Sequence, residues 1–147
     1  MVIDYQYITY QTMLPGGARK EFRNGLLFCY MPKNEHFSDG AQWHTATGWS
    51  CYTCKGHTQS DTLANCLYEA AIKNFPGRRI RTDYSDKDPD WEENFYLLRK
   101  TLCAAVLSEN YFMDNKSDLE YLQSRAVKQT IIDTHVEGII EYLEMNS

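Results

Sequence analysis

The chain has 147 residues, of which 43% are hydrophobic and 14% aromatic, and its 15 Lys and Arg against 20 Asp and Glu give a formal charge of −5. This length and composition predict one domain with a hydrophobic core and exclude disorder, which requires low hydrophobicity together with a high net charge. The acidic balance argues against a nucleic-acid partner, because binding to a phosphate backbone needs a basic face.

Residues 1–25 are difficult to assign, and we treat them as a divergent N-terminal segment that contains a turn signal at Leu14–Gly17. The apolar run LLFCYM, Leu26–Met31, follows and predicts a strand that is buried on both faces. The polar stretch after it contains His36 and His44. We expect this stretch to be a loop beyond a strand end, where functional groups are common.

The segment GWSCYTC, residues 48–54, alternates aromatic and β-branched residues with other types, which predicts a second strand. It contains a C-x-x-C pair, Cys51 and Cys54. Side chains three residues apart on a strand point to opposite faces, so we do not expect these two thiols to chelate one metal ion. Five cysteines are too few for a disulfide scaffold, and their odd number leaves at least one unpaired. A reducing compartment is therefore the default expectation.

A helix is predicted from a cap at Ser60 or Asp61 to Phe75, because its apolar residues recur at helical spacing and Pro76-Gly77 follow. RRIRTDY, residues 78–84, is the expected returning strand. The acidic segment DYSDKDPDWEEN, residues 83–94, is interpreted as a solvated loop in preference to a cation site, because it lacks the calcium-loop pattern.

Two further short strands are predicted at 95–100 and 104–107, and Ser117 is expected to open a short helix through a capping box. A final helix over about 125–143 has an apolar stripe that we expect to face the core. Strands that alternate with helices indicate an α/β domain with a mixed, largely parallel sheet flanked by helices.

Several stretches of the chain resemble segments of one known family and occur in the same order as in that family. They are QWHTATGWSCYT, KGHTQSDTLANCLYEAA, PGRRIRTDYSDKDPDWEENFYLLRKT, CAAVLSENYFMDNKSDLEYLQS and the closing HVEGIIEYL. Together they resemble the C-terminal two-thirds of the zinc-dependent N-acetylmuramoyl-L-alanine amidases of the type-3 class. On this basis residues 26–147 are expected to form an amidase-like α/β domain that is truncated at its N-terminus.

The resemblance implies hydrolysis of the amide that joins the lactyl group of N-acetylmuramic acid to L-alanine in peptidoglycan. In the family a histidine, a glutamate and a second histidine bind zinc, and another glutamate acts on the metal-bound water. Glu109 in SENYFMDN matches that catalytic glutamate. Asn110, Phe112 and Asn115 match its frame, and we expect the two asparagines to contact substrate.

The metal ligands match less well, since no Gly-His-Gly-Gly motif is present and residues 1–25 are too short for the family's opening strand and helix. The remaining ligand should follow the 26–31 strand, where His36 is the nearest histidine. His44 is a candidate substrate contact or a surface residue. For His57 and His135, packing or exposure is the simpler account.

We therefore expect a zinc amidase that acts on peptidoglycan or muropeptide, with Glu109 as general base and His36 as a ligand. The alternative is a degenerate amidase domain that lacks a complete zinc site and binds muropeptide or protein. In a third possibility, the chain is a fragment, and another chain or an omitted N-terminal segment supplies the missing ligands. No apolar run approaches the ~20 residues that span a bilayer, and no signal peptide is visible, so we expect a protein that stays in the cytoplasm until released, or acts at the wall as a phage-type lysin or excised domain.

Overall fold

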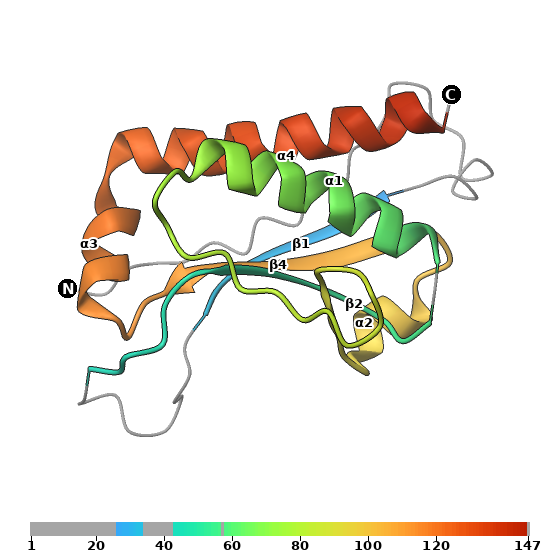
Figure 1. Ribbon diagram of the computed structural model, residues 1–147, viewed down its shortest axis with the longest axis horizontal. Coiled ribbons are helices and arrows are strands. Elements are labelled where there is room, and N and C mark those ends of the chain that lie inside the picture. The colour runs from blue at the N-terminus through green and yellow to red at the C-terminus, as the bar shows by residue number, and fades with distance from the viewer. Residues whose placement is uncertain (1–25, 34–42, 57, 147) are drawn as a thin grey trace.

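The computed structural model describes residues 26–33, 43–56 and 58–146, which are built on a four-stranded sheet (Figure 1). The strands are β1 (Leu26–Lys33), β2 (Trp49–Thr53), β3 (Trp91–Glu92) and β4 (Ala104–Phe112), in the order β1-β4-β2-β3. β1 pairs with β4 in parallel, β2 pairs with β3 in parallel, and β2 runs antiparallel to β4. The sheet is mixed with two of its three pairings parallel, which confirms the predicted fold class.

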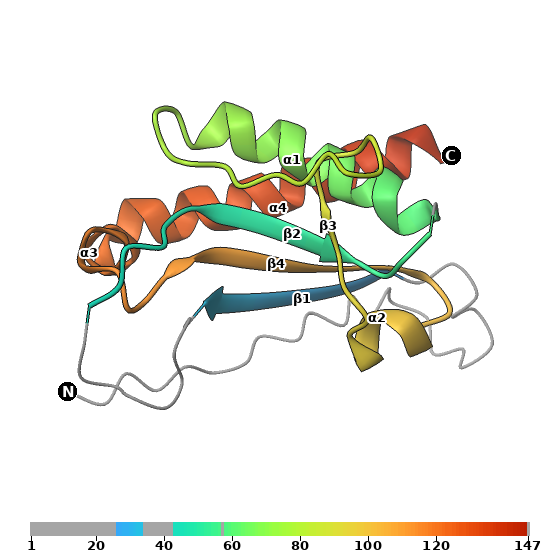
Figure 2. The ribbon, with the colours of Figure 1, turned by 60° about the horizontal axis from the view of Figure 1, so that its bottom comes forward.

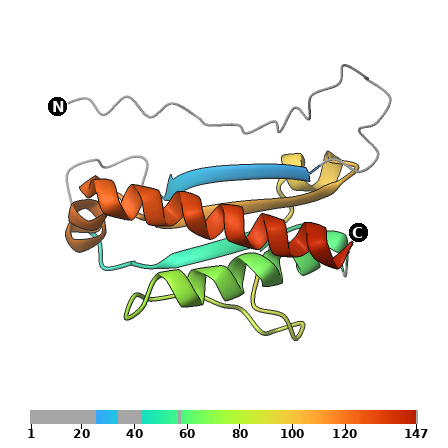
Figure 3. The same cartoon turned by 90° about the horizontal axis from the view of Figure 1, so that it is seen from above.

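Two long helices cover one face of the sheet. α1 (Gln59–Asn74) and α4 (Arg125–Met145) lie side by side over this face, and α3 (Lys116–Gln123) links the end of β4 to α4 (Figures 1 and 3). The short helix α2 (Tyr96–Lys100) lies on the opposite face (Figure 2). Among the described residues, the sheet therefore has a heavily covered face and a more sparsely covered one, which we call the open face.

The start of α1 follows from its local sequence. Thr58 is the N-cap, its hydroxyl accepts the backbone N–H of Ser60 at 3.0 Å, and the Asp61 carboxylate accepts the backbone N–H of Thr58 in return. This reciprocal capping box satisfies donors that have no partner inside the helix. The helix ends immediately before Phe75, so its predicted extent is confirmed within one or two residues.

The main core lies between the sheet and the two long helices. Alternation along β2 sends Trp49 and Cys51 into this core, and it sends Tyr52 to a smaller cluster with Leu98 on the other face. Cys54, just beyond the strand, packs against the smaller cluster. The two cysteines of the C-x-x-C pair therefore serve opposite faces, as their spacing predicts.

Gly138 marks the closest approach of α4 to α1. A Cβ atom added at this glycine would lie 2.9 Å from the Cα atom of Leu67 on α1 and 2.8 Å from its Cδ2 atom. Contacts this short do not occur between real side chains, so the helix crossing depends on the absence of a side chain at 138.

Two predicted strands are wrong. Residues 78–84 make only an isolated parallel bridge, between Ile80 and Trp49, because the segment pairs with the first residue of β2 alone. Residues 96–100 form helix α2, which buries Leu98 and leaves Tyr96 exposed. Leu, Arg and Lys favour helix over strand, and this preference prevails where the run is too short to pair.

The apolar stripe of α4 is only partly buried. Val127 and Ile131 lie in the main core, whereas four other members are 46 to 51% exposed, namely Ile132, Val136, Ile140 and Leu143. The prediction that the whole stripe faces the core is therefore wrong, because α1 and the sheet cover one side of α4 only. None of the described helices has the length and apolar character needed to span a bilayer.

Candidate functional site

Glu109 lies on the central strand β4, opposite Met31 of β1 on one side and Ser50 of β2 on the other. Its two neighbours point toward the helices, since the Ser108 hydroxyl lies 2.9 Å from Nε2 of His135 and Asn110 contacts Trp49. Side chains alternate along a strand, so Glu109 points to the open face. It is half-buried there, away from α1 and α4.

A β-bulge follows Glu109 directly. Between the pairs Met31–Glu109 and Lys33–Phe112, β4 uses one residue more than β1, and Tyr111 has a positive φ of 64°. The Tyr111 ring is buried against Phe75, with a centroid distance of 5.6 Å. Such bulges redirect side chains and are common beside active sites. Here the bulge makes Glu109 the last side chain that β4 directs to the open face before its alternation breaks.

The expected position of Glu109 needs correction. The sequence predicts a strand over 104–107 with Glu109 directly after it, but β4 continues to Phe112 and Glu109 lies inside it. The sequence does not predict that the strand extends beyond Leu107, because the apolar run ends there and the polar residues Ser108, Glu109 and Asn110 follow. Pairing with strands on both sides keeps these polar residues in the sheet.

Asn110 is fully buried in the core. Its Oδ1 accepts the indole N–H of Trp49 at 3.0 Å, and its Nδ2 donates to the Ser108 hydroxyl at 3.1 Å. The hydroxyl in turn donates to His135, whose Nδ1–H donates to the carbonyl of Ile131 at 2.6 Å. The structure thus gives Asn110 a packing role, and its contact with substrate stays a prediction.

Asn115 and His44 lie together beyond the end of β4. The backbone N–H of His44 donates to the carbonyl of Asp114 at 2.8 Å, and Nδ2 of Asn115 donates to the carbonyl of His44 at 3.4 Å. The structure therefore brings these two predicted substrate contacts to one place. Asn115 is also the N-cap of α3, which corrects the prediction that Ser117 opens this helix.

Asp118 holds the same region together, and sequence reasoning did not single it out. Its buried carboxylate accepts hydrogen bonds from the Thr47 hydroxyl at 2.7 Å, the Gly48 N–H at 3.2 Å and the Phe112 N–H at 3.1 Å. Gly48 has a φ of 115°, and a Cβ there would lie 2.7 Å from the Arg79 carbonyl oxygen. The only signal in the sequence was the position of Asp118 three residues after the cap Asn115.

The described residues do not form a zinc site at Glu109. Among them, the only group of three or more His, Cys, Asp or Glu side chains close enough to share an ion is Asp61, Asp88 and Asp90. This group has carboxylate oxygens alone and no imidazole or thiolate, the donors typical of zinc. His36 and His57 lie outside the described residues, so the prediction of His36 as a ligand stays a prediction.

His135 is a packing residue, in line with the simpler account of it. Burial inside the helix pair lowers its pKa to about 4, although its hydrogen bond to the Ile131 carbonyl acts in the opposite direction. The imidazole is therefore neutral at pH 7 and donates through Nδ1 while it accepts through Nε2.

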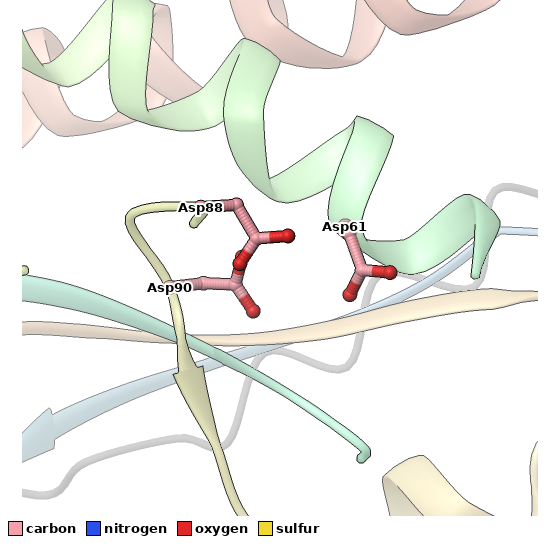
Figure 4. A group of neighbouring side chains, drawn as sticks. All are labelled: Asp61, Asp88 and Asp90. Atoms are coloured by element: carbon pink, nitrogen blue, oxygen red, sulfur yellow. The ribbon is translucent and has the colours of Figure 1, made fainter. Parts of the chain in front are cut away.

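The three aspartates converge between α1 and the segment that leads into β3 (Figure 4). One carboxylate oxygen from each lies within 4.8 Å of the others. Burial, and then the nearby charges of Asp88 and Asp61, raise the pKa of Asp90 to about 7, against the effect of a 2.6 Å hydrogen bond from the Thr53 hydroxyl. Asp90 is 1% exposed, so the interpretation of this acidic segment as solvated is wrong for that residue.

Comparisons with known proteins agree on one family. The family model for N-acetylmuramoyl-L-alanine amidase matches residues 35–141. The chain is 46% identical over 94 residues to the N-acetylmuramoyl-L-alanine amidase CwlM of Bacillus licheniformis. That alignment covers 63% of this chain but 34% of CwlM, so the chain spans about a third of this curated relative.

Solved structures show the same fold at low sequence identity. An N-acetylmuramoyl-L-alanine amidase from Clostridium difficile 630 superposes with a TM-score of 0.69 at 21% identity, over 83% of this chain and 59% of that one. The catalytic domain of CwlV from Bacillus (Paenibacillus) polymyxa gives a TM-score of 0.63 at 20% identity, over 81% and 57%. The CwlD amidase of Clostridioides difficile, solved in complex with the GerS lipoprotein, gives 0.60 at 20% identity, over 82% and 55%.

Proposed function

Because the chain belongs to the N-acetylmuramoyl-L-alanine amidase family, we propose that it hydrolyses the amide bond between N-acetylmuramic acid and L-alanine in peptidoglycan. The matched segment, residues 35–141, contains the whole of β4, α1 and α3, and α4 as far as residue 141. Peptidoglycan or a muropeptide is the proposed partner. The proposed place of action is the cell wall, which the protein reaches on release from the cell or as an excised domain.

The position of Glu109 is the observation that carries the proposal. It is a half-buried carboxylate on the central strand, on the open face and directly before the bulge. A carboxylate in such a place can take a proton from an attacking water and return it to the leaving amine, which is general acid–base catalysis. The position thus combines access from the open face with support from strands on both sides.

The family is generally zinc-dependent, and His36 remains the proposed ligand from this chain. The described residues do not form a group of three ligands beside Glu109, so a zinc site there would need at least one ligand from outside the described residues. We assign to Glu109 only the proton transfer that its carboxylate performs. His44 and Asn115, held together beyond the end of β4, are the proposed substrate contacts.

The test is release of free L-alanine amino termini from purified peptidoglycan, with and without added zinc, by the unaltered chain and by Glu109→Gln. The amide is nearly isosteric with the carboxylate but accepts no proton at neutral pH, so we expect the rate to fall by roughly 10²-fold or more. Glu120→Gln, an exposed residue on α3, is the matched control. An unchanged rate in Glu109→Gln would refute the assignment.

The second candidate function, which the family match does not favour, is that of a degenerate amidase domain without a complete zinc site. A degenerate amidase domain would bind muropeptide without cutting it. Co-sedimentation with insoluble peptidoglycan separates the two functions. Binding without release of amino termini at any zinc concentration supports the binding module, and release that depends on Glu109 supports the hydrolase.

A further inference from the structure

We propose that Asp61, Asp88 and Asp90 form a binding site for one divalent cation of the size of Ca²⁺, separate from Glu109 and on the opposite face of the sheet. The three side chains come from two parts of the chain. Asp61 lies in the first turn of α1, while Asp88 and Asp90 lie in the segment between α1 and β3 (Figure 4). A cation here would fasten that segment to the helix.

The spacing of the carboxylates suits calcium. One oxygen from each aspartate lies within 4.8 Å of the others. Calcium binds oxygen at 2.3–2.6 Å, so two of its ligands can be separated by up to about 4.6–5.2 Å, whereas Mg²⁺ with bonds of 2.0–2.1 Å reaches only about 4.0–4.2 Å. All the separations in the cluster are within the reach of calcium, whereas Mg²⁺ demands near-ideal octahedral geometry and gives up its water reluctantly, so calcium is the ion we expect.

Asp90 supplies the second, independent observation. The residue is 1% exposed, and its Oδ2 accepts the Thr53 hydroxyl at 2.6 Å. Its Oδ1 is also buried and accepts no hydrogen bond from any donor among the described residues. A buried carboxylate oxygen without a partner is costly, because it has lost its water and gained nothing in exchange. A bound cation is the partner that this oxygen lacks.

The other two aspartates bring a carboxylate oxygen each to the same place. The capping bond of Asp61 uses Oδ2, so it occupies one of the two carboxylate oxygens of this buried residue. Asp88 is half-buried at the outer side of the cluster. Three neighbouring carboxylates repel one another, and a divalent cation removes this repulsion while it satisfies Asp90.

The site is distinct from the catalytic candidate. Thr53, which contacts Asp90, lies three positions along β2 from Ser50, which is opposite Glu109. Positions three apart on a strand face opposite ways. The aspartates therefore lie on the side of α1, and Glu109 lies on the open side. Calcium binding can thus be tested without any measurement of hydrolysis.

The test uses the full chain after treatment with a chelator. Calorimetric titration with CaCl₂ should show one Ca²⁺ per chain, and the melting temperature should rise with calcium, because a ligand that binds only the folded state stabilises it. MgCl₂ should give a weaker response. Asp88→Asn should weaken calcium binding by roughly tenfold or more, equivalent to about 1.4 kcal/mol, and Asp90→Asn should do at least as much.

Asp133→Asn is the matched control, because it makes the same charge change at an exposed position of α4 and should leave calcium binding unchanged. If Asp90→Asn does not fold, the half-buried Asp88 decides the result. The absence of any heat or melting shift with calcium in the unaltered chain would overturn the proposal. Calcium binding that survives in both Asp88→Asn and Asp90→Asn would overturn it equally. A third contrary outcome is that Asp90→Asn stabilises the chain while calcium has no effect on the unaltered chain. That result would mean that the three carboxyl groups share protons and do not bind a cation.

Discussion

The carboxylate of Asp118 accepts the backbone N–H of Gly48 at 3.2 Å, and this bond joins α3 to the residue that leads into β2. The same carboxylate also accepts the hydroxyl of Thr47 and the N–H of Phe112, at the end of β4. One side chain thus connects the start of β2 and the end of β4 to α3. Its removal should loosen the end of the sheet near His44 and Asn115.

Asp118→Asn should lower the free energy of unfolding by roughly 2–4 kcal/mol, because hydrogen bonds to a charged acceptor contribute about 1.5–3 kcal/mol each and the amide keeps a single acceptor oxygen. Urea denaturation followed by circular dichroism measures the change. Glu120→Gln, two residues on and exposed, should stay within about 0.5 kcal/mol of the unaltered chain. Equal stability of the two variants would show that the three bonds contribute nothing.

Asn110→Ala should destabilise the chain by roughly 2–4 kcal/mol, because it leaves the indole N–H of Trp49 and the hydroxyl of Ser108 buried with one partner fewer each. Asn115→Ala, at the cap of α3, should cost less, about 1 kcal/mol. Chemical denaturation of both variants, beside co-sedimentation with peptidoglycan, separates packing from substrate contact. If Asn110→Ala kept full stability but bound peptidoglycan weakly, Asn110 would be a substrate contact, as its sequence context predicts, and not a packing residue.

His135 should make stability depend on pH between about 6.5 and 4. Burial lowers its pKa in the folded chain to about 4, so over this range the unfolded chain binds a proton that the folded chain does not. The stabilisation is fully present above pH 6.5 and is lost as the pH falls toward 4, by roughly 3 kcal/mol in total. Protonation also removes the acceptor that the Ser108 hydroxyl uses.

The measurement is the difference in unfolding free energy between the unaltered chain and His135→Gln at several pH values. Subtraction removes the contributions of the other titrating groups, which the two chains share. The difference should change by the stated amount between pH 7 and pH 4.5. A difference that stays constant would mean that His135 titrates alike in the folded and unfolded chains.

Gly138→Ala should destabilise the chain by roughly 1–3 kcal/mol, because the new methyl group meets the backbone of Leu67 and forces α1 and α4 apart. The sign is informative, since glycine to alanine in an exposed helix interior normally stabilises by up to about 1 kcal/mol. Thermal or urea denaturation gives the value. Glu141→Ala, exposed on α4, is the control and should have almost no effect.

The elements that were predictable from sequence are those whose signals are local. α1 has a capping box and a Pro-Gly stop, α4 has a long helical period, and β1 and β2 have apolar or alternating runs. The extension of β4 past Leu107 was not predictable, because strands from other parts of the chain hold its polar residues in place. Residues 96–100 differ, because the helix preference of Leu, Arg and Lys is a local signal that the strand prediction did not weigh.

The candidate site divides in the same way. The resemblance of SENYFMDN to the family motif predicts Glu109 as the catalytic residue. Its place inside β4 is not predictable, because it depends on a bulge in which Tyr111 has a positive φ, and a tyrosine rarely adopts that conformation. The aspartate cluster was rejected because the acidic segment has no calcium-loop spacing. Asp61 and Asp90 are 29 positions apart in the chain and meet only when α1 packs beside the segment before β3.

Strand β4 directs its hydrogen-bonded packing residues to one face of the sheet and the candidate catalytic carboxylate to the other. Ser108 and Asn110 belong to a hydrogen-bonded chain that reaches α4, while Glu109 between them faces the other way. A protein engineer can therefore repack the helical side for heat resistance, or add charge to the exposed stripe of α4 for solubility, and leave the carboxylate untouched. Variant libraries at the residues on one side of this strand could therefore be selected for thermal stability, and libraries on the other side for catalytic activity, independently of each other.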